Sequence, residues 1–374
     1  MIKLFHFITD TNIGGAGKLL CNQIKNMEGT EFETTVVIPR KSALAHELSS
    51  LPCSVIEADN CADTSFSGRS FIEDYTIIKK WRPDIVHSHG SLSSRIAATA
   101  LGVPTRIFTR HCVFPLDPMM QNPLTKRVVG IANGMFSTSI LAVAESARQN
   151  LIDMGCDQSR ITTVINGVEP LRIIDDVEKE YLRKKYNLTN KSFVISIFAR
   201  LEEYKGHRTL LEAIKICKKY YPCFRFFIVG EGSQKNPLIA LSKAMKIDDT
   251  VCFLGFCNDV APIFNITDIN VNCSYGTETS SLAISEGMSL GIPCIASDYG
   301  GNSHMVKNAV NGLLFPAKNA EALANAIIRL YRDKELYKRC SLGALQRYNN
   351  EFTARAMTEK MMELYRREHA KNKK

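Results

Sequence analysis

The chain lacks the features that mark membrane-spanning, exported and disulfide-stabilised proteins. None of its apolar runs approaches the roughly 18 residues that a membrane span requires, and its N-terminus has no apolar signal region or small-residue cleavage site. Its 12 cysteines are irregularly spaced and form no C-x-x-C pair, which favours a reducing cytoplasm over a disulfide framework or a zinc site. We therefore expect a cytoplasmic protein that does not cross a bilayer.

The first half of the chain has no net charge. Residues 1–170 carry 16 Lys and Arg against 16 Asp and Glu, so the net charge of +9 arises in the second half. A frayed, solvated helix end explains the basic residues among positions 354–374 more simply than an anion-binding tail does. Aromatic and basic residues are not interleaved as on a nucleic-acid platform, so no nucleic-acid partner is expected.

Short β-branched runs alternate with longer amphipathic stretches, which is typical of βαβ units and parallel sheets. The expected strands cover residues 3–9, 34–38, 53–57, 84–88, 105–109, 139–143, 161–165, 193–201, 224–232, 251–256, 268–273, 293–297 and 311–316. The expected helices cover residues 18–27, 70–80, 92–101, 206–219, 259–266, 281–290 and 320–333, with a closing helix after Thr353.

The length of 374 residues exceeds that of one usual hydrophobic core, which favours two domains. The alternation breaks at the charged, weakly periodic residues 166–192, which we expect to form a connector and a surface helix, and then restarts. We predict an N-terminal Rossmann-like domain at 1–170, a linker at 171–192, a second Rossmann-like domain at 193–352, and a closing helix with a basic tail at 353–374.

A glycine-rich loop, "DTNIGGAGKLL", follows the first expected strand. Ligands of open parallel sheets bind beyond the carboxyl ends of the strands, and such a turn into a helix can cradle a phosphate with backbone N–H groups. A Walker A loop would need glycine in place of Asn12 and Ser or Thr in place of Leu19, and Leu20 breaks the dinucleotide fingerprint. The loop therefore does not support an NTPase or dehydrogenase function. A plain tight turn remains an alternative interpretation of these residues.

Two cations follow the first strand of the second half, where "RLEEYKG" places Arg200 and Lys205 five residues apart. Two fixed positive charges in a strand-to-helix loop can address the phosphates of a departing group. A solvated basic loop is the alternative reading of the same residues.

Two glutamates, Glu278 and Glu286, stand in "TETSSLAISEGMSLG", a stretch that otherwise has no charge. Burying a lone carboxylate is costly unless it is paired or hydrogen-bonded, so these acids should have partners, and ligand hydroxyls are suitable ones. We predict that both border one cleft. A helix N-cap acid and a structural core acid form the alternative.

The motifs of the second half together resemble those of the retaining glycosyltransferases of family 4, which have the GT-B fold. They are E-x7-E from Glu278 to Glu286, G-x-P at 291–293, glycines at 300 and 301, R-L-x-x-x-K-G from Arg200, and "VGEG", "GF…D" and "NGLLFP". In the first half the resemblance covers "GGAG", "VHSHG" and "VINGV". It therefore spans essentially the whole chain and implies two Rossmann-like doubly wound parallel-sheet domains facing across a cleft.

The resemblance implies a role for each matching residue. Arg200 and Lys205 would hold the diphosphate of a nucleotide-sugar, Glu278 the hydroxyls of the donor sugar, and Glu286 the ribose hydroxyls. Further residues of the nucleotide-sugar site would be Gly14 and Gly15, from the opposite domain, and Ser281 and Leu282.

Three histidines follow or end expected strands of the first half. His111, in "RIFTRHC", falls where members of the family place a catalytic-pocket histidine close to the donor sugar, with a loop histidine bonded to backbone as the alternative. His87 and His89 are expected to shape the acceptor side or the strand end, because two imidazoles without a third ligand make a poor metal site. The chain also lacks D-x-D, the motif with which metal-using glycosyltransferases hold a divalent ion. We expect no metal and no cofactor.

Two positions depart from the family pattern. Ser281 stands where glycine is common, and His304 stands where "GG-x-x-E" usually has glutamate. The first change is mild because a serine hydroxyl or its N–H can still face the donor, and the second can alter packing or donor contacts.

The sequence thus predicts a metal-independent retaining glycosyltransferase that moves a hexose or N-acetylhexosamine, with a UDP-sugar favoured as donor. The resemblance implies front-face attack and a glycan or polyprenyl-diphosphate-linked acceptor in the biosynthesis of surface polysaccharide such as lipopolysaccharide or capsule. A non-catalytic nucleotide-sugar binder and a GT-B epimerase are the alternatives. Clusters that could touch anionic lipid at the inner membrane face are Lys79, Lys80 and Arg82, and Lys126 with Arg127, although the balanced charge of this half leaves strong attachment unsupported.

Overall fold

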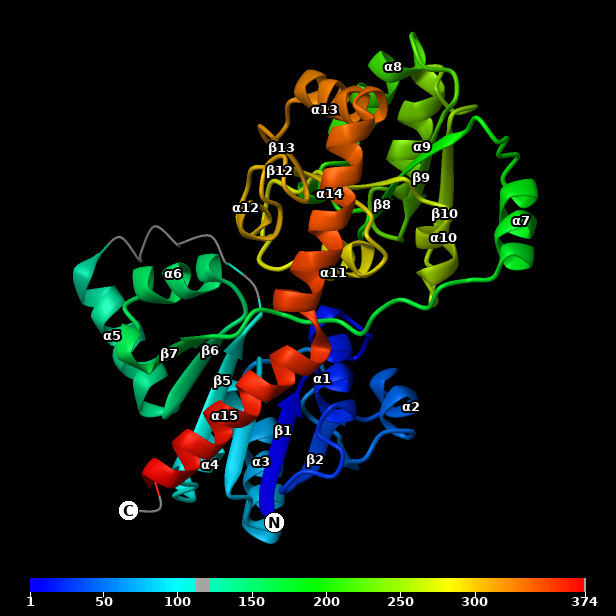
Figure 1. Ribbon diagram of the computed structural model, residues 1–374. Helices are drawn as coiled ribbons and strands as arrows, with labels where there is room; N and C mark the ends of the chain where they lie inside the picture. Colours follow the sequence, from blue (N-terminus) through cyan, green and yellow to red (C-terminus); the bar gives the residue numbers. More distant parts are fainter. Residues whose placement is uncertain (112, 114–121, 373–374) are drawn as a thin grey trace. The chain divides into compact units, whose positions relative to one another are not determined.

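The computed structural model describes residues 1–111, 113 and 122–372, which form two compact units (Figure 1). Unit 1 comprises Met1–Val168 together with Ala354–Lys374, and unit 2 comprises Glu169–Thr353. The sequence-based boundaries differ from these in two ways. The predicted linker at 171–192 belongs to unit 2, and the surface helix expected within this segment is α7 (Asp176–Lys185); the closing helix belongs to unit 1.

Unit 1 is built on a seven-stranded parallel sheet with strand order β3-β2-β1-β4-β5-β6-β7. Its strands are β1 (Ile2–Ile8), β2 (Phe32–Pro39), β3 (Ser54–Ala58), β4 (Ile85–His89), β5 (Thr105–Arg110), β6 (Ser139–Ala142) and β7 (Ile161–Thr163). Its helices are α1 (Gly15–Lys25), α2 (Leu44–Leu48), α3 (Gly68–Trp81), α4 (Leu92–Ala100), α5 (Pro123–Met135), α6 (Glu145–Asp153), the short η2 (Gln158–Arg160) and α15 (Ala354–Asn372).

Unit 2 repeats the arrangement with six parallel strands in the order β10-β9-β8-β11-β12-β13. Its strands are β8 (Phe193–Phe198), β9 (Phe224–Val229), β10 (Val251–Gly255), β11 (Ile269–Asn272), β12 (Cys294–Ser297) and β13 (Gly312–Phe315). Its further helices are η3 (Glu203–Lys205), α8 (His207–Lys218), α9 (Lys235–Ala244), α10 (Ala261–Asn265), α11 (Leu282–Ser289), α12 (Asn302–Met305), α13 (Ala320–Arg332), α14 (Lys334–Arg347) and η4 (Tyr348–Phe352).

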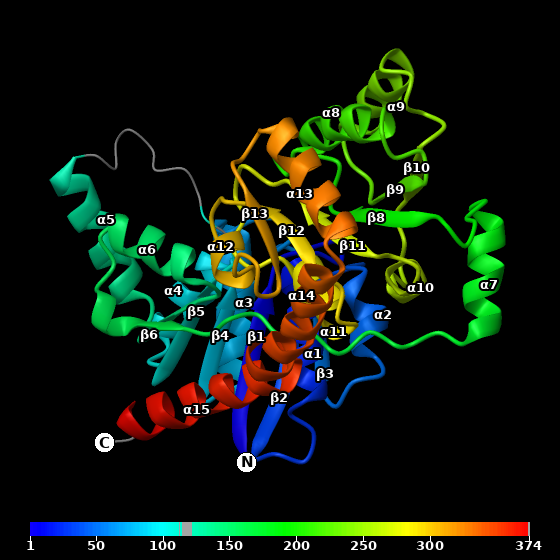
Figure 2. The ribbon, with the colours of Figure 1, turned by 45° about the horizontal axis from the view of Figure 1, so that its top comes forward.

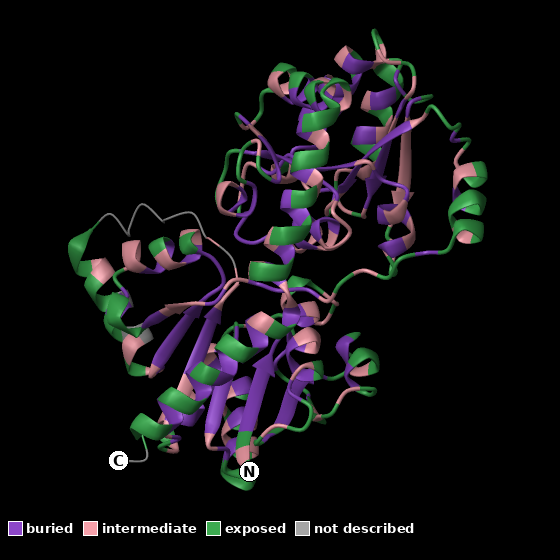
Figure 3. Cartoon of the chain, in the orientation of Figure 1, coloured by how far each residue is buried: buried purple, intermediate pink, exposed green. Residues whose placement is uncertain are grey.

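The central strands of both sheets are buried on both faces, which explains their nearly continuous apolar character (Figure 3). Alternate residues of β2 show the two faces, since Val37 packs in the cluster that contains α3 and α4 while Val36 and Ile38 pack in the cluster that contains α1. The same division holds in unit 2, where Ile195 packs with α8 and α13 and Val194 packs with Leu182 of α7. The prediction of two doubly wound α/β domains is confirmed.

The order of the strands reverses direction once in each sheet, between β1 and β4 in unit 1 and between β8 and β11 in unit 2. At such a point the loops leaving the two neighbouring strands diverge to opposite faces and leave a crevice beyond the strand ends. Ligand-binding residues are therefore expected in the loops after these four strands.

Helix α15 returns from unit 2 and lies along unit 1, next to α1, in both views (Figures 1 and 2). It buries Met357, Met361, Leu364 and Tyr365. The expectation that these closing residues form a frayed, solvated helix end is therefore wrong. Most charges of the helix occupy its exposed face, although Glu368 is buried, and its apolar stripe is spaced for packing.

None of the helices in the described part of the chain is both long and apolar enough to span a bilayer. The 11 cysteines that the structure describes are free thiols.

Replacing Tyr365 by Ala should destabilise the protein strongly, because its ring is fully buried against unit 1. A truncation of this size costs about 3–5 kcal/mol of unfolding free energy. Tyr181 on α7 is 62% exposed, so Tyr181→Ala is the matched control and should change stability little. Urea titrations followed by circular dichroism test this, and equal effects of the two substitutions would contradict the placement of α15.

Candidate active site

The loops that follow β8 and β11 meet at the reversal point of the unit 2 sheet. The two strands are parallel neighbours, with Ile269 opposite Ile195, so their carboxyl ends lie at the same edge. The loop after β8 carries Arg200 and Lys205, and the loop after β11 carries Glu278. The fold therefore brings the predicted cations and one of the predicted acids to the edge of the sheet where open sheets bind ligands.

Lys205 and Glu278 form a nearly buried ion pair. Lys205 Nζ donates to Glu278 Oε2 at 2.8 Å, and the two side chains are 16% and 7% exposed. The same carboxylate oxygen accepts hydrogen bonds from Ser274 Oγ at 2.7 Å and from Asn272 Nδ2 at 3.4 Å. The expectation that a buried glutamate must have partners is confirmed, and the solvated-loop alternative does not describe Lys205.

Electrostatics keep this carboxylate charged inside the protein. Burial alone would raise the pKa of Glu278, but the positive charge of Lys205 and the hydrogen bonds from Lys205, Ser274 and Asn272 outweigh it and hold the pKa below its usual value. Glu278 is thus an anionic acceptor group at neutral pH. It is also not the N-cap of α11, since that position is Ser281.

Glycines allow the loops to approach closely enough to make this pair. A Cβ on Gly206 would lie 2.1 Å from the carbonyl oxygen of Cys273, and one on Gly300 would lie 2.3 Å from the carbonyl oxygen of Glu278. Both glycines have positive φ, at 73° and 57°. Gly301, whose Cβ would lie 1.4 Å from the Thr279 carbonyl oxygen, donates its N–H to the Glu278 carbonyl at 3.2 Å. The glycines next to Lys205 and after β12 therefore fix the positions of the charged residues.

A polar network beneath the ion pair was missed in the sequence. Asn272 Oδ1 accepts from the backbone N–H of Ser274 at 3.0 Å and from Asn302 Nδ2 at 3.3 Å, and Asn302 also bonds Ser297 Oγ at 3.1 Å. All four side chains are buried. The available signal was the presence of asparagine in an otherwise apolar strand, "DINVNC", because buried amides need partners.

The remaining predicted residues of unit 2 occupy the same edge with weaker connections. Arg200 is exposed, and its Nη2 donates to Tyr204 Oη at 2.8 Å. Glu286 is partly buried in the second turn of α11, a helix that begins at Leu282 and has Ser281 as its N-cap. The backbone N–H of Ser281 faces Met305 Sδ at 3.2 Å. The φ of Ser281 is −69° and needs no glycine, which explains why serine is tolerated there.

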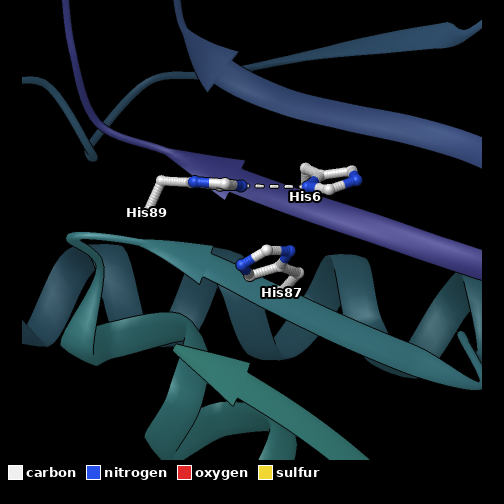
Figure 4. A group of neighbouring side chains, drawn as sticks. All are labelled: His6, His87 and His89. Carbon is white, nitrogen blue, oxygen red and sulfur yellow. Dashed lines mark hydrogen bonds between the residues drawn. The ribbon is translucent and has the colours of Figure 1, made fainter. Parts of the chain in front are cut away.

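Four histidines gather at the corresponding edge of unit 1. His6 lies on β1, His87 and His89 on β4, and His111 directly after β5. His6 Nδ1 and His89 Nε2 are 3.0 Å apart (Figure 4), and His89 Nδ1 and His111 Nε2 are 2.9 Å apart. His87 bonds the hydroxyls of Tyr365 and Thr109, each at 2.6 Å. The sequence predicted that His111 lies near strand ends but not that it terminates a histidine chain.

This chain of imidazoles is electrically neutral. Burial lowers the pKa of His6 to about 3 and that of His111 to about 4, and it lowers the pKa values of His87 and His89 well below their usual range. A neutral imidazole has one N–H and one lone pair, so the direction of one hydrogen bond fixes the others.

Two directions are compatible with these distances. Either His6 Nδ1 donates to His89 Nε2 and His89 Nδ1 donates to His111 Nε2, or both hydrogen bonds run the other way. In both cases the three rings change tautomer together.

A metal could in principle use three of these imidazoles. One nitrogen from each of His6, His87 and His89 lies within 4.8 Å of the others, so the sequence argument that His87 and His89 lack a third ligand is wrong. However, both nitrogens of His87 already bond hydroxyl groups, and the three residues include no carboxylate to offset a buried dication. The expectation of no metal therefore stays a prediction.

The glycine loop of unit 1 leads into α1, with Gly14 as N-cap and Gly15 as first residue. A Cβ on Gly14 would meet only Asp10 Oδ2, at 3.6 Å. Folding alone therefore does not require glycine at position 14. The missing side chain instead favours the close approach of another molecule to the backbone. Gly17 differs, because its Cβ would lie 2.6 Å from Leu44.

Comparison with known families places these motifs. Residues 178–347 match the family described as "Glycosyl transferases group 1", and residues 13–172 match "Glycosyltransferase Family 4". The chain belongs to the family 4 glycosyltransferases. This glycosyltransferase is 27% identical over 375 residues to the UDP-Gal:alpha-D-GlcNAc-diphosphoundecaprenol alpha-1,3-galactosyltransferase of Escherichia coli, with 97% of this chain and 96% of that protein covered.

Solved structures share the fold of this glycosyltransferase. A Rickettsia africae glycosyltransferase superimposes with a TM-score of 0.85 at 21% identity, covering 98% of each chain. Anabaena Alr3699/HepE, solved with UDP and glucose, gives a TM-score of 0.82 at 19% identity, covering 98% of this chain and 99% of that one. The predicted GT-B fold is confirmed.

The second departure of this glycosyltransferase from the family pattern lies beside an acid from elsewhere in the chain. His304 Nε2 is 4.0 Å from Glu351 Oε2, and Glu351 also binds Arg347 at 2.8 Å. Arg347 donates to the backbone carbonyl of His304 as well, at 3.1 Å. His304 is therefore tied to the helical segment that closes unit 2.

Lys205→Ala should destabilise unit 2 by about 3–5 kcal/mol, because it leaves the Glu278 carboxylate buried without its counter-charge. The double variant Lys205→Ala/Glu278→Gln removes both charges and should recover much of that loss. Urea unfolding of the two variants measures the difference. A double variant no more stable than the single one would contradict a buried, charged Glu278.

The histidine chain should make stability depend on pH. Its folded-state pKa values lie below the unfolded value of 6.5, so the unfolded chain binds more protons below that pH. The stabilisation is fully present above pH 6.5 and is lost as the pH falls toward about 4, at up to about 1.4 kcal/mol per pH unit for each group. Unfolding free energies at pH 7 and pH 5 should differ less in His6→Asn than in the wild type. The exposed His46 supplies the control, and a slope lowered equally by His46→Asn would oppose this account.

Proposed function

We propose that this family 4 glycosyltransferase is a cytoplasmic, metal-independent retaining enzyme. It transfers a hexose or N-acetylhexosamine from a UDP-sugar to a glycan or polyprenyl-diphosphate-linked acceptor during the synthesis of surface polysaccharide. The observation that carries the proposal is the buried pair of Lys205 and Glu278 at the reversal point of the unit 2 sheet. It presents one fixed cation and one fixed anion, which match the two chemical parts of an activated sugar.

The proposed donor contacts follow from the charges of the side chains. Lys205 and Arg200 hold the diphosphate, and Glu278 accepts hydrogen bonds from hydroxyls of the donor sugar. Glu286 accepts from the ribose hydroxyls. The other proposed donor contacts come from Ser281 and Leu282 at the N-terminus of α11 and from Gly14 and Gly15 at the N-terminus of α1, where backbone N–H groups favour anions.

The proposed chemistry depends on where charge develops. Cleavage of the sugar–diphosphate bond makes the anomeric carbon positive and the leaving phosphate negative, so cations already fixed near that phosphate lower the barrier. Glu278 lies next to Lys205 and can stabilise the positive sugar. In front-face attack the leaving phosphate takes the proton of the acceptor hydroxyl. No side chain of unit 2 is assigned as a nucleophile.

His111 is proposed to act as a neutral hydrogen-bonding group close to the sugar. Burial lowers the pKa of His111 to about 4, so its imidazole is neutral at pH 7 and can take part in hydrogen bonds with hydroxyl or phosphate oxygens. His89, whose Nδ1 lies 2.9 Å from His111 Nε2, would act as a positioning residue for this ring.

Names and contents of relatives support the choice of donor and acceptor. The Escherichia coli relative is named for a UDP-sugar donor and a diphosphoundecaprenol acceptor, and the Anabaena structure holds UDP and glucose. A non-catalytic nucleotide-sugar binder and an epimerase acting on the donor are the competing functions, and product analysis separates them.

Incubation with UDP-glucose or UDP-galactose should release UDP slowly without an acceptor, and Lys205→Ala should lower that rate by about 100-fold or more, as removal of a transition-state charge contact does. The matched control is Lys235→Ala, which breaks the exposed Lys235–Glu231 pair and should leave the rate unchanged. Tight UDP binding without hydrolysis would indicate a binder, and a new nucleotide-sugar without release of UDP would indicate an epimerase.

A thermal-shift screen of UDP, GDP and ADP sugars should give its largest shift with the UDP compounds. A ligand at a hundred times its dissociation constant stabilises the folded state by about 2.7 kcal/mol. Glu286→Gln should reduce the shift if this carboxylate holds the ribose, whereas a larger shift with GDP or ADP sugars would overturn the choice of base.

A further inference from the structure

Helix α5 of unit 1 exposes a stripe of large apolar side chains. Leu124, Val128, Ile131 and Met135 are 70%, 58%, 53% and 59% exposed. Their spacing of four, three and four residues puts them on one face of the helix. Folded proteins seldom leave such a row of apolar side chains in water unless it meets a membrane or a partner. We call these four residues the α5 stripe.

The opposite face of α5 is packed so closely that the stripe must face outward. A Cβ on Gly130 would lie 1.8 Å from the carbonyl oxygen of Gly155, and a Cβ on Gly155 would lie 2.2 Å from that of Lys126. Arg160 Nη1 donates to the carbonyl oxygen of Gly134 at 2.8 Å. Backbone-to-backbone contact on this face holds the helix without using its large apolar residues.

A polar hollow with an excess of positive charge adjoins the last turn of α5. Its lining includes Gly134 of α5 and the cations Arg106, Arg160, Arg367 and Lys371. The only acid in this lining is Glu368, which already pairs with Arg367 and Lys371 at 3.1 Å each. We call this feature the basic hollow.

Two of the cations in the basic hollow repel each other. Burial and the nearby charge of Arg160 lower the pKa of Arg106, and Arg106 Nε is buried without a hydrogen-bond partner in the described structure. An anionic oxygen in the hollow would relieve the repulsion between the two guanidinium groups.

The charge of α5 itself favours an anionic partner. The helix carries Lys126 and Arg127 and no acid. Helix α7 of unit 2 makes a useful contrast, since it also exposes Val177 and Tyr181 but places Asp176, Glu178 and Glu180 around them. Of these two helices, only α5 combines exposed apolar residues with uncompensated positive charge. This composition is typical of helices that lie in a membrane interface.

We propose that the α5 stripe and the basic hollow together form a surface that docks on an anionic lipid bilayer. The stripe enters the boundary between headgroups and acyl chains, and the hollow receives a lipid phosphate. The inference deepens the proposed function, because a polyprenyl-linked acceptor lies in a membrane. It assigns the contact to α5 and the adjoining hollow, and it does not involve Lys79, Lys80 and Arg82 at the end of α3.

Vesicle flotation tests this surface with the full-length chain. The wild type should float with vesicles of equal parts phosphatidylglycerol and phosphatidylcholine, and it should float poorly with phosphatidylcholine alone. Val128→Glu/Ile131→Glu should lower binding by about tenfold or more, since each buried methylene group of an interfacial anchor strengthens binding about fourfold. Lys371→Glu should weaken binding to the anionic vesicles, and high salt should do the same.

Val177→Glu on α7 is the matched control and should leave flotation unchanged. Release of UDP from the donor, measured without vesicles, should be the same in all these variants, so a failure of docking and a failure of the proposed function give different results. Equal flotation of wild type and Val128→Glu/Ile131→Glu would overturn the proposal. So would a wild type that does not float but forms a dimer dispersed by that double substitution, because the stripe would then bind a second copy of the chain.

Discussion

The buried pair of Lys205 and Glu278 is the constraint on which the organisation of unit 2 depends. A carboxylate in this position is tolerated only because a cation and two polar side chains surround it. Those partners come from the loops after two neighbouring strands, β8 and β11, so the parallel order of the sheet is required for the pair to form. Glycines at 206, 300 and 301 then bring the backbones close enough. The strongest motif residues of the chain thus serve one electrostatic arrangement.

At the equivalent edge of its sheet, unit 1 has buried polar groups of a different kind. There the buried polar groups are neutral imidazoles that satisfy one another, and no counter-charge is needed. Tyr365 from α15 completes the arrangement by bonding His87, and Gln23 of α1 donates to the same hydroxyl at 2.8 Å. The last helix of the chain is therefore part of the core beneath the histidines. Unit 2 thus buries a charged pair, whereas unit 1 buries neutral imidazoles.

Much of the fold could be predicted because local patterns follow directly from packing. Each of the seven strands expected in the first half is present, with ends shifted by two residues at most. Helices α5, α6 and α9 are not among the expected helices. In α5 the large apolar residues face outward and glycine faces inward, which is the reverse of the usual pattern. The polar network of Asn272, Ser297 and Asn302 was missed because its members are far apart in the chain.

The sequence by itself determined the βα alternation, the two-domain organisation, the glycine loops and the charged residues that follow β8 and β11, because each is expressed within a few consecutive residues. Only the tertiary structure decided that Lys205 contacts Glu278, that His6 joins His89 and His111, and that α15 packs on the unit that begins the chain. These contacts join residues 22 to 342 positions apart in the chain. Strand order brings such segments together, and no short-range pattern encodes strand order.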